Sequence, residues 1–236
     1  MRREGVGPWQ LSTTGETGYP PATPKQHLTE APLSESITLY GFGDNDRSGK
    51  IRWLAHELGL EIEEQRVSLG AHRKAPYREL NPLAQIPTLI FRGQTYVEST
   101  AACQALAEAF DSPKLWVGRG EAQRSAYLYW LAAFTESLEG RLVEALLSRV
   151  GVLDSAFFGL HEKTLRFKLR VLADQLPESG FLCGPDLTVA DVAAGYSLRL
   201  ALQSGLVERE AIDPYFSRLV ARPAAGDARF FDGLPS

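Results

Sequence analysis

The spacing of apolar residues changes several times in the first half of the sequence. Alternation of apolar and polar residues predicts strands, and apolar residues at every third or fourth position predict amphipathic helices. The predicted order is strand, helix, strand, short helix, hairpin and helix, over residues 37–40, 51–58, 61–69, 75–80, 88–97 and 103–110. The first three elements form a βαβ unit. Together the elements make a small α/β layer.

After Gly118 the strand signal disappears and helical spacing continues to the end. Single apolar faces recur over residues 130–145, 165–176, 189–200 and 212–219. An α/β segment followed by an all-helical one, joined by a segment with proline and glycine, predicts two domains. We place the α/β domain at residues 37–111, the linker at 112–118 and the helical domain at 119–236.

The first 36 residues differ from the rest in composition. They are rich in Pro, Gly, Thr, Ser and Glu, and they lack a periodic apolar face. Such a segment buries too little apolar surface to offset the entropy of ordering. Residues 1–36 are therefore predicted to be a flexible N-terminal extension.

Composition and charge exclude several classes of protein. No run approaches the roughly 18 consecutive apolar residues of a membrane span. A net charge of −4 and a pI near 5.7 give no basic field for nucleic acid. The two cysteines, Cys103 and Cys183, form no metal-ligand spacing and are too few for a disulfide scaffold. We expect a cytoplasmic protein with no metal and with neither membrane nor nucleic acid as a partner.

Six short segments follow one another along the chain. They are KIRWLAHELGLEIE, GAHR at 70–73, NPLAQIPTL at 81–89, Glu98-Ser99, LTVADVA at 187–193 and ARPA at 221–224. In this order they resemble the cytosolic glutathione S-transferase family, in a bacterial-type form with phi- and theta-like N-terminal motifs. The resemblance implies a thioredoxin-like N-terminal domain followed by an all-α C-terminal bundle. It also implies glutathione as co-substrate, a homodimer and a role in detoxification.

Two pairs of residues carry the glutathione site that this resemblance implies. Pro87 matches the cis-proline of the family, and Ile86 offers its backbone N–H and C=O to the cysteinyl part of glutathione. Ser99 stands where a helix N-cap is expected, and a helix start of this kind is suited to the γ-glutamyl carboxylate. Glu98 is then placed to pair with the γ-glutamyl amine.

The glycyl end of glutathione is assigned by resemblance to His72, Arg73 and Gln85. A cation and an amide donor suit a carboxylate. The second substrate is expected between the domains, against the helix that carries Tyr127, Trp130, Phe134 and Ser137, although aromatic residues at this spacing are also typical of a core. These residues do not indicate which electrophile is the second substrate.

Activation of glutathione requires a donor near the start of the first helix. A free thiol has a pKa of about 8.5, so stabilising the thiolate needs a helix N-terminus and a short hydrogen bond. By resemblance, the serine of phi-, theta- and zeta-like members falls on Asn45, which can donate but cannot act as an acid or base. Ser48 and Tyr40 are the alternatives. The role of Asn45 or Asp46 as a plain N-cap also stays open.

Two functions follow from these residues. In the first, the protein is an enzyme that adds the glutathione thiolate to an electrophile, or uses it to reduce a peroxide or disulfide; Asn45 favours the reductive option. In the second, it is a non-catalytic binding or regulatory protein with the same fold. Thr188 and Asp191 are a separate, structural motif, because their spacing predicts a capping box at the start of a helix.

Overall fold

The computed structural model describes residues 36–43, 46–110 and 113–234. The predicted N-terminal extension thus lies almost wholly outside the described residues, and so does Asn45. The described residues belong to a single compact unit.

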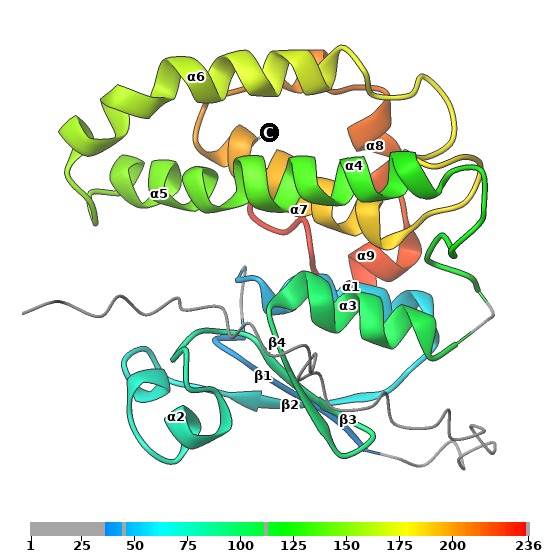
Figure 1. The fold of residues 1–236 in the computed structure, drawn as a ribbon. Helices are drawn as coiled ribbons and strands as arrows, with labels where there is room; N and C mark the ends of the chain where they lie inside the picture. The colour runs from blue at the N-terminus through cyan, green and yellow to red at the C-terminus, as the bar shows by residue number, and fades with distance from the viewer. Residues whose placement is uncertain (1–35, 44–45, 111–112, 235–236) are drawn as a thin grey trace, which may run out of the picture. The chain divides into compact units, whose positions relative to one another are not determined.

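A four-stranded mixed sheet forms the base of the described N-terminal half (Figure 1). Its strands, in spatial order, are β2 (Ile62–Arg66), β1 (Ile37–Gly41), β3 (Thr88–Phe91) and β4 (Gln94–Val97). β1 is parallel to β2 and antiparallel to β3, and β3 and β4 form the antiparallel hairpin. Arg92 and Gly93 between them both have positive φ, as a two-residue hairpin turn requires. The predicted βαβ unit and hairpin are confirmed.

Helices α1 (Ser48–Glu57) and α3 (Ser99–Glu108) lie on the sheet face that is turned toward the helical half, whereas α2 (Tyr77–Leu80) lies away from it (Figure 1). A short 3₁₀ helix, η1 (Ala71–Arg73), precedes α2. Ile51 and Leu54 of α1 are fully buried, as their spacing predicted. Gly59 follows α1 with φ +66°, a conformation that glycine adopts without strain.

Helices are the main elements of the described second half, which has no strand beyond an isolated β-bridge between Phe181 and Gly184. Its elements are α4 (Arg124–Phe134), the π-helical turn η2 (Thr135–Glu139), α5 (Gly140–Arg149), α6 (Ser155–Ala173), α7 (Val189–Gln203), η3 (Arg209–Ala211), α8 (Tyr215–Val220) and α9 (Pro223–Asp227). The protein therefore has the predicted architecture, a thioredoxin-like α/β layer and an all-α bundle. None of the described helices is both long and apolar enough to cross a membrane.

Helix α7 lies at the centre of the core. Every residue from Val189 to Ala201 is buried, and α7 contacts α1 and α3 of the first half as well as α4 and α5 of the second. The fold therefore brings the first turn of α1 close to the segment that joins α4 and α5.

The start of α7 carries the predicted capping box. The Asp191 carboxylate accepts hydrogen bonds from the Thr188 backbone N–H at 2.8 Å and from the Thr188 hydroxyl at 2.9 Å. It also accepts bonds from the Leu182 backbone N–H at 2.9 Å and the Tyr215 hydroxyl at 2.8 Å. Asp191 is fully buried, so this carboxylate joins three separate segments in the core.

Candidate functional site

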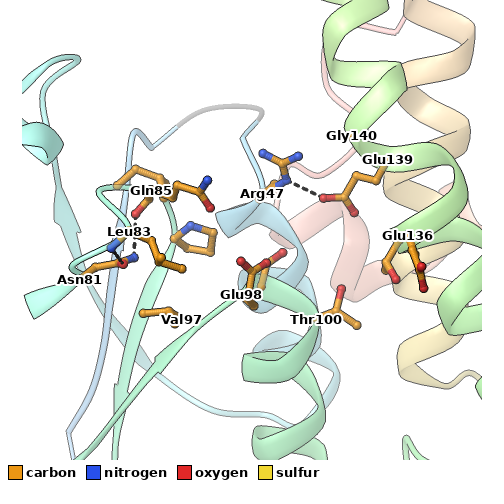
Figure 2. A pocket seen from close by; sticks show the side chains of 14 residues that line it. Arg47, Asn81, Leu83, Gln85, Val97, Glu98, Thr100, Glu136, Glu139 and Gly140 are labelled. Carbon is orange, nitrogen blue, oxygen red and sulfur yellow. Dashed lines mark hydrogen bonds and ion pairs between the residues drawn. The ribbon is translucent and has the colours of Figure 1, made fainter. Parts of the chain in front are cut away.

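A cavity of about 420 Å³ lies where the α/β layer meets the helical bundle (Figure 2). Its walls come from the loop before β3, the start of α3, the N-cap of α1 and the π-helical turn. The lining residues are Arg47, Asn81, Leu83, Gln85, Ile86, Pro87, Val97, Glu98, Ser99, Thr100, Thr135, Glu136, Glu139 and Gly140. This volume suits a small organic ligand.

The loop before β3 is held by hydrogen bonds to one carbonyl group. The backbone C=O of Gln85 accepts the Tyr77 hydroxyl at 2.7 Å and the amide of the Asn81 side chain at 2.9 Å. The same amide donates to the Thr88 hydroxyl at 3.1 Å. Asn81 is 1% exposed, so the asparagine of the predicted Asn-Pro turn fixes the backbone that leads to Ile86. The Ile86–Pro87 bond is cis, as predicted.

The opposite wall is the start of α3. Ser99 was expected to be the N-cap of this helix. It is instead the first helical residue. Glu98 takes the cap position with φ +66°, and its side chain makes no capping hydrogen bond. Strained backbone of this kind is frequent at ligand sites. The wall thus offers a carboxylate beside a helix N-terminus, a pair suited to a ligand with an ammonium and a carboxylate.

A buried charge cluster forms the third wall. Glu139 is 5% exposed, and its two oxygens accept hydrogen bonds from Arg47 Nε at 2.5 Å and Lys50 Nζ at 2.6 Å. Lys50 is 1% exposed and lies over the face of Tyr196, 4.9 Å from the ring centre. Burial would lower the pKa of Arg47, but the charge and hydrogen bond of Glu139 outweigh it and raise that pKa above its ordinary value.

The structure brings together five of the predicted site residues and leaves Ser48, His72 and Arg73 outside the cavity lining. Gln85, Ile86, Pro87, Glu98 and Ser99 all line the cavity. His72 does not line it, because its ring is turned inward, where Nδ1 accepts the Gly70 backbone N–H at 3.2 Å and the edge of the ring packs against Phe42. Arg73 is exposed and does not line it either.

The candidates for the sulfur contact are also placed differently from what was expected. Ser48 is 1% exposed and outside the lining, and a Cβ built on Gly41 would lie 2.6 Å from its hydroxyl, which shows that the hydroxyl faces Gly41. Tyr40 packs edge-on against Tyr77 and does not line the cavity. The N-cap of α1 is Arg47 and not Asp46, although the Asp46 carboxylate accepts the Ser48 backbone N–H at 2.5 Å from one position earlier. Asn45 lies outside the described residues, so its role stays a prediction.

The helix expected to face the second substrate contributes different residues. Tyr127, Trp130 and Phe134 are all buried, and none of them lines the cavity. They are therefore core residues, the alternative that their spacing left open. Ser137 does not line the cavity either. Thr135, Glu136, Glu139 and Gly140 provide this wall, and the first three of them belong to the π-helical turn.

Two charged residues of the cavity, Arg47 and Glu139, were not found from the sequence. Arg47 and Glu139 are 92 positions apart, so no local motif joins them. One local signal does exist for the turn that carries Glu139. Trp130, Phe134, Leu138 and Leu142 are spaced by four, and such a run drifts around a regular helix of 3.6 residues per turn. A π-helical turn corrects this drift.

Neither cysteine of the protein lines the cavity. Burial raises the pKa of the Cys103 thiol to about 12 and that of the half-buried Cys183 thiol to about 11. Both are therefore poor nucleophiles at neutral pH. Among the described residues, no group of three or more His, Cys, Asp or Glu is arranged to hold a metal ion.

Comparison with known proteins identifies the family. The family model described as "Glutathione S-transferase, N-terminal domain" matches residues 47–109. Glutathione S-transferase 3 of Zea mays is 27% identical over 203 residues, which cover 80% of this chain and 90% of that protein. The glutathione S-transferase-like protein LUC7 of a Fusarium species is 30% identical over 166 residues, which cover 68% of this chain and 75% of that protein.

A solved structure agrees with these relatives. It is the glutathione transferase URE2P6 from Phanerochaete chrysosporium in complex with oxidized glutathione, which superposes with a TM-score of 0.73 at 25% identity. The match covers 83% of this chain and 96% of that one. With the thioredoxin-like layer, the helical bundle and the cavity between them, these similarities show that the protein belongs to the glutathione S-transferase family.

Proposed function

We propose that this protein is a glutathione transferase that binds reduced glutathione in the cavity and activates its thiol for addition to an electrophile. The observation that supports this proposal is the convergence of Gln85, Ile86, Pro87, Glu98 and Ser99 on one cavity. They come from the loop before β3 and the start of α3, and each was assigned to glutathione from the sequence. The URE2P6 structure, which contains oxidized glutathione, adds support at the level of the family.

The parts of glutathione can be matched to groups with complementary chemistry. The backbone of Ile86 would pair with the cysteinyl backbone, the helix start at Ser99 would receive the γ-glutamyl carboxylate, and Glu98 would pair with the ammonium. Gln85 would serve the glycyl end. His72 and Arg73 stay in the proposal as residues that would have to move toward the ligand.

Reduction of a peroxide or disulfide by glutathione is the second candidate. It is favoured by Asn45, which cannot act as an acid or base where serine stands in related classes. Because Cys103 is buried, Cys183 is half-buried and both lie outside the cavity lining, such a reaction would use the thiol of glutathione and not a protein thiol. Turnover with an aryl halide, a peroxide and a mixed disulfide separates these reactions, and binding with no turnover would favour the non-catalytic alternative.

Glutathione affinity tests the site directly. Glu98→Gln removes the charge proposed to pair with the ammonium, so we expect the dissociation constant measured by calorimetry to rise by about 10-fold to 100-fold. Glu108→Gln makes the same change at the far end of α3, outside the cavity, and is expected to leave the affinity unchanged. If wild-type protein gives no heat with millimolar glutathione, or if both variants bind equally well, the proposal is wrong.

We also propose that the protein is a homodimer, as the family resemblance implies. The outer faces of α4 and α6 support this, because Tyr129, Phe167 and Val171 are 47%, 57% and 38% exposed there. Sedimentation equilibrium should give twice the protomer mass of 26.0 kDa, and Phe167→Glu should shift the distribution toward the monomer. A monomer mass for the wild type at micromolar concentration would contradict this proposal.

A further inference from the structure

One wall of the cavity is left free by the proposed position of glutathione. The tripeptide is assigned to the loop before β3 and to the start of α3, on the side of the α/β layer (Figure 2). The π-helical turn and the first residue of α5 form the opposite side, with Thr135, Glu136, Glu139 and Gly140. An electrophile has to lie beside the bound thiol to react with it. The second substrate would therefore make its own contacts with this wall.

The side chains of this wall differ in what they can offer a ligand. Both oxygens of Glu139 already accept hydrogen bonds from cations at the start of α1. The Thr135 hydroxyl donates its proton to the Leu131 backbone C=O at 2.7 Å, and Gly140 has no side chain. Glu136 is exposed, and its carboxylate makes no hydrogen bond or ion pair with any other residue that the structure describes. The wall therefore offers acceptors, and its side chains have no free donor.

The charge of the cavity favours the same kind of partner. Its described lining holds one cation, Arg47, and three carboxylates, those of Glu98, Glu136 and Glu139. The buried Lys50, which pairs with Glu139, adds a second cation, so the site remains net negative. Glutathione brings two further carboxylates against one ammonium, and its thiolate adds another negative charge. The occupied cavity therefore attracts a positively charged second substrate and repels an anionic one.

The groups of bound glutathione occupy the other charged residues. The γ-glutamyl ammonium is assigned to Glu98 and the γ-glutamyl carboxylate to the helix start at Ser99. The glycyl carboxylate is assigned to Gln85, and Arg47 is the cation of the described lining that is available to the negative groups of the tripeptide. Glu136 is then the carboxylate that has a partner neither in the described fold nor in the tripeptide.

Glu136 also borders a second cavity, of about 390 Å³, between the π-helical turn, α5 and α6. Three basic side chains line that cavity, those of Arg141, His161 and Lys168. Arg141 pairs with Glu144 at 3.0 Å, and none of the three makes a hydrogen bond or ion pair with Glu136. None of them lines the glutathione cavity, so a ligand in the glutathione cavity meets the carboxylate and not these cations.

Resting on the proposed function, we propose that Glu136 selects the second substrate, and that this substrate is an electrophile carrying a protonated amine. The ammonium would pair with the Glu136 carboxylate while the electrophilic carbon faces the sulfur of glutathione. Glu136 takes no part in the bond changes and acts on specificity alone. The pair would be partly exposed to water, so we expect a contribution of about 3-fold to 10-fold in rate.

The test uses three chloronitroarenes that differ in the charge of one substituent. They are 4-chloro-3-nitrobenzylamine, which is cationic at neutral pH, the neutral 4-chloro-3-nitrobenzyl alcohol, and the anionic 4-chloro-3-nitrobenzoate. In each, the glutathione thiolate forms a C–S bond at the ring and chloride leaves with the electron pair of the C–Cl bond. We take kcat/KM of Glu136→Gln relative to wild type for each compound, so that their intrinsic reactivities cancel. This ratio should fall by about 3-fold to 10-fold with the amine, stay near one with the alcohol, and stay at or above one with the benzoate.

Calorimetry with the three corresponding glutathione conjugates makes the same comparison without turnover. Glu136→Gln should weaken binding of the amine conjugate alone, and it should leave the affinity for glutathione unchanged. Glu144→Gln removes a glutamate charge on α5, outside the glutathione cavity, and should leave every ratio near one.

The outcomes separate this inference from the proposed function. An equal loss with all three compounds in Glu136→Gln would overturn the inference, because it would make Glu136 a support of the site and not a selector of charge. No loss with the amine and its conjugate would overturn it too, and glutathione binding by wild type would then leave the proposed function in place. If wild type does not bind glutathione, the proposed function has failed and this inference fails with it.

Discussion

Replacing Glu139 with alanine is expected to lower the free energy of unfolding by about 3 to 5 kcal/mol, the usual cost of removing one partner of a buried ion pair. The reason is Lys50, which is 1% exposed and would keep its charge in the core with no counter-charge. Arg47 contributes less to this cost because its side chain reaches solvent. Urea unfolding followed by circular dichroism measures the effect.

Two further variants show whether the buried charge is the cause. Glu136→Ala changes an exposed glutamate on the same π-helical turn and should alter stability by less than about 0.5 kcal/mol. The double variant Lys50→Met with Glu139→Leu removes both buried charges and should recover most of the loss, since apolar replacements of buried pairs are often neutral or stabilising. A loss below about 1 kcal/mol in Glu139→Ala would show that water reaches Lys50.

This cluster also shows where prediction from the sequence ends. The strands, the hairpin at Arg92-Gly93 and the helix start at Thr188 were predictable because each depends on residues within a few positions of one another. The cavity loop was predictable for the same reason, since Asn81 and Gln85 are four residues apart. These local signals were enough to indicate one half of the site.

The other half depends on contacts over long separations. Lys50 and Glu139 are 89 positions apart, and they meet because α1 and the π-helical turn both pack against α7. His72 and Ser48 have residue types that suit a ligand, but both side chains are buried in the protein. Their burial could not be predicted from local sequence. Sequence spacing indicates the residues on each wall of the cavity, whereas the fold determines which wall faces which.

The second large effect is expected at Asp191, which lies in the core and outside the cavity lining. Asp191→Ala should lower the free energy of unfolding by about 3 to 5 kcal/mol, the cost of leaving a buried polar network without its centre. The backbone N–H groups of Leu182 and Thr188 and the hydroxyls of Thr188 and Tyr215 would all lose their acceptor. Thermal unfolding should show a clear fall in melting temperature.

Asp191→Asn tests this explanation more strictly, because it keeps the size of the side chain. An amide has one acceptor oxygen, and its NH₂ group would face donors that are now bonded to the carboxylate, so this variant should also be clearly destabilised. Asp186→Ala, an exposed aspartate just before the same helix, should change stability by less than about 0.5 kcal/mol. If Asp191→Asn is as stable as wild type, the negative charge and its full set of acceptors are not what holds the start of α7.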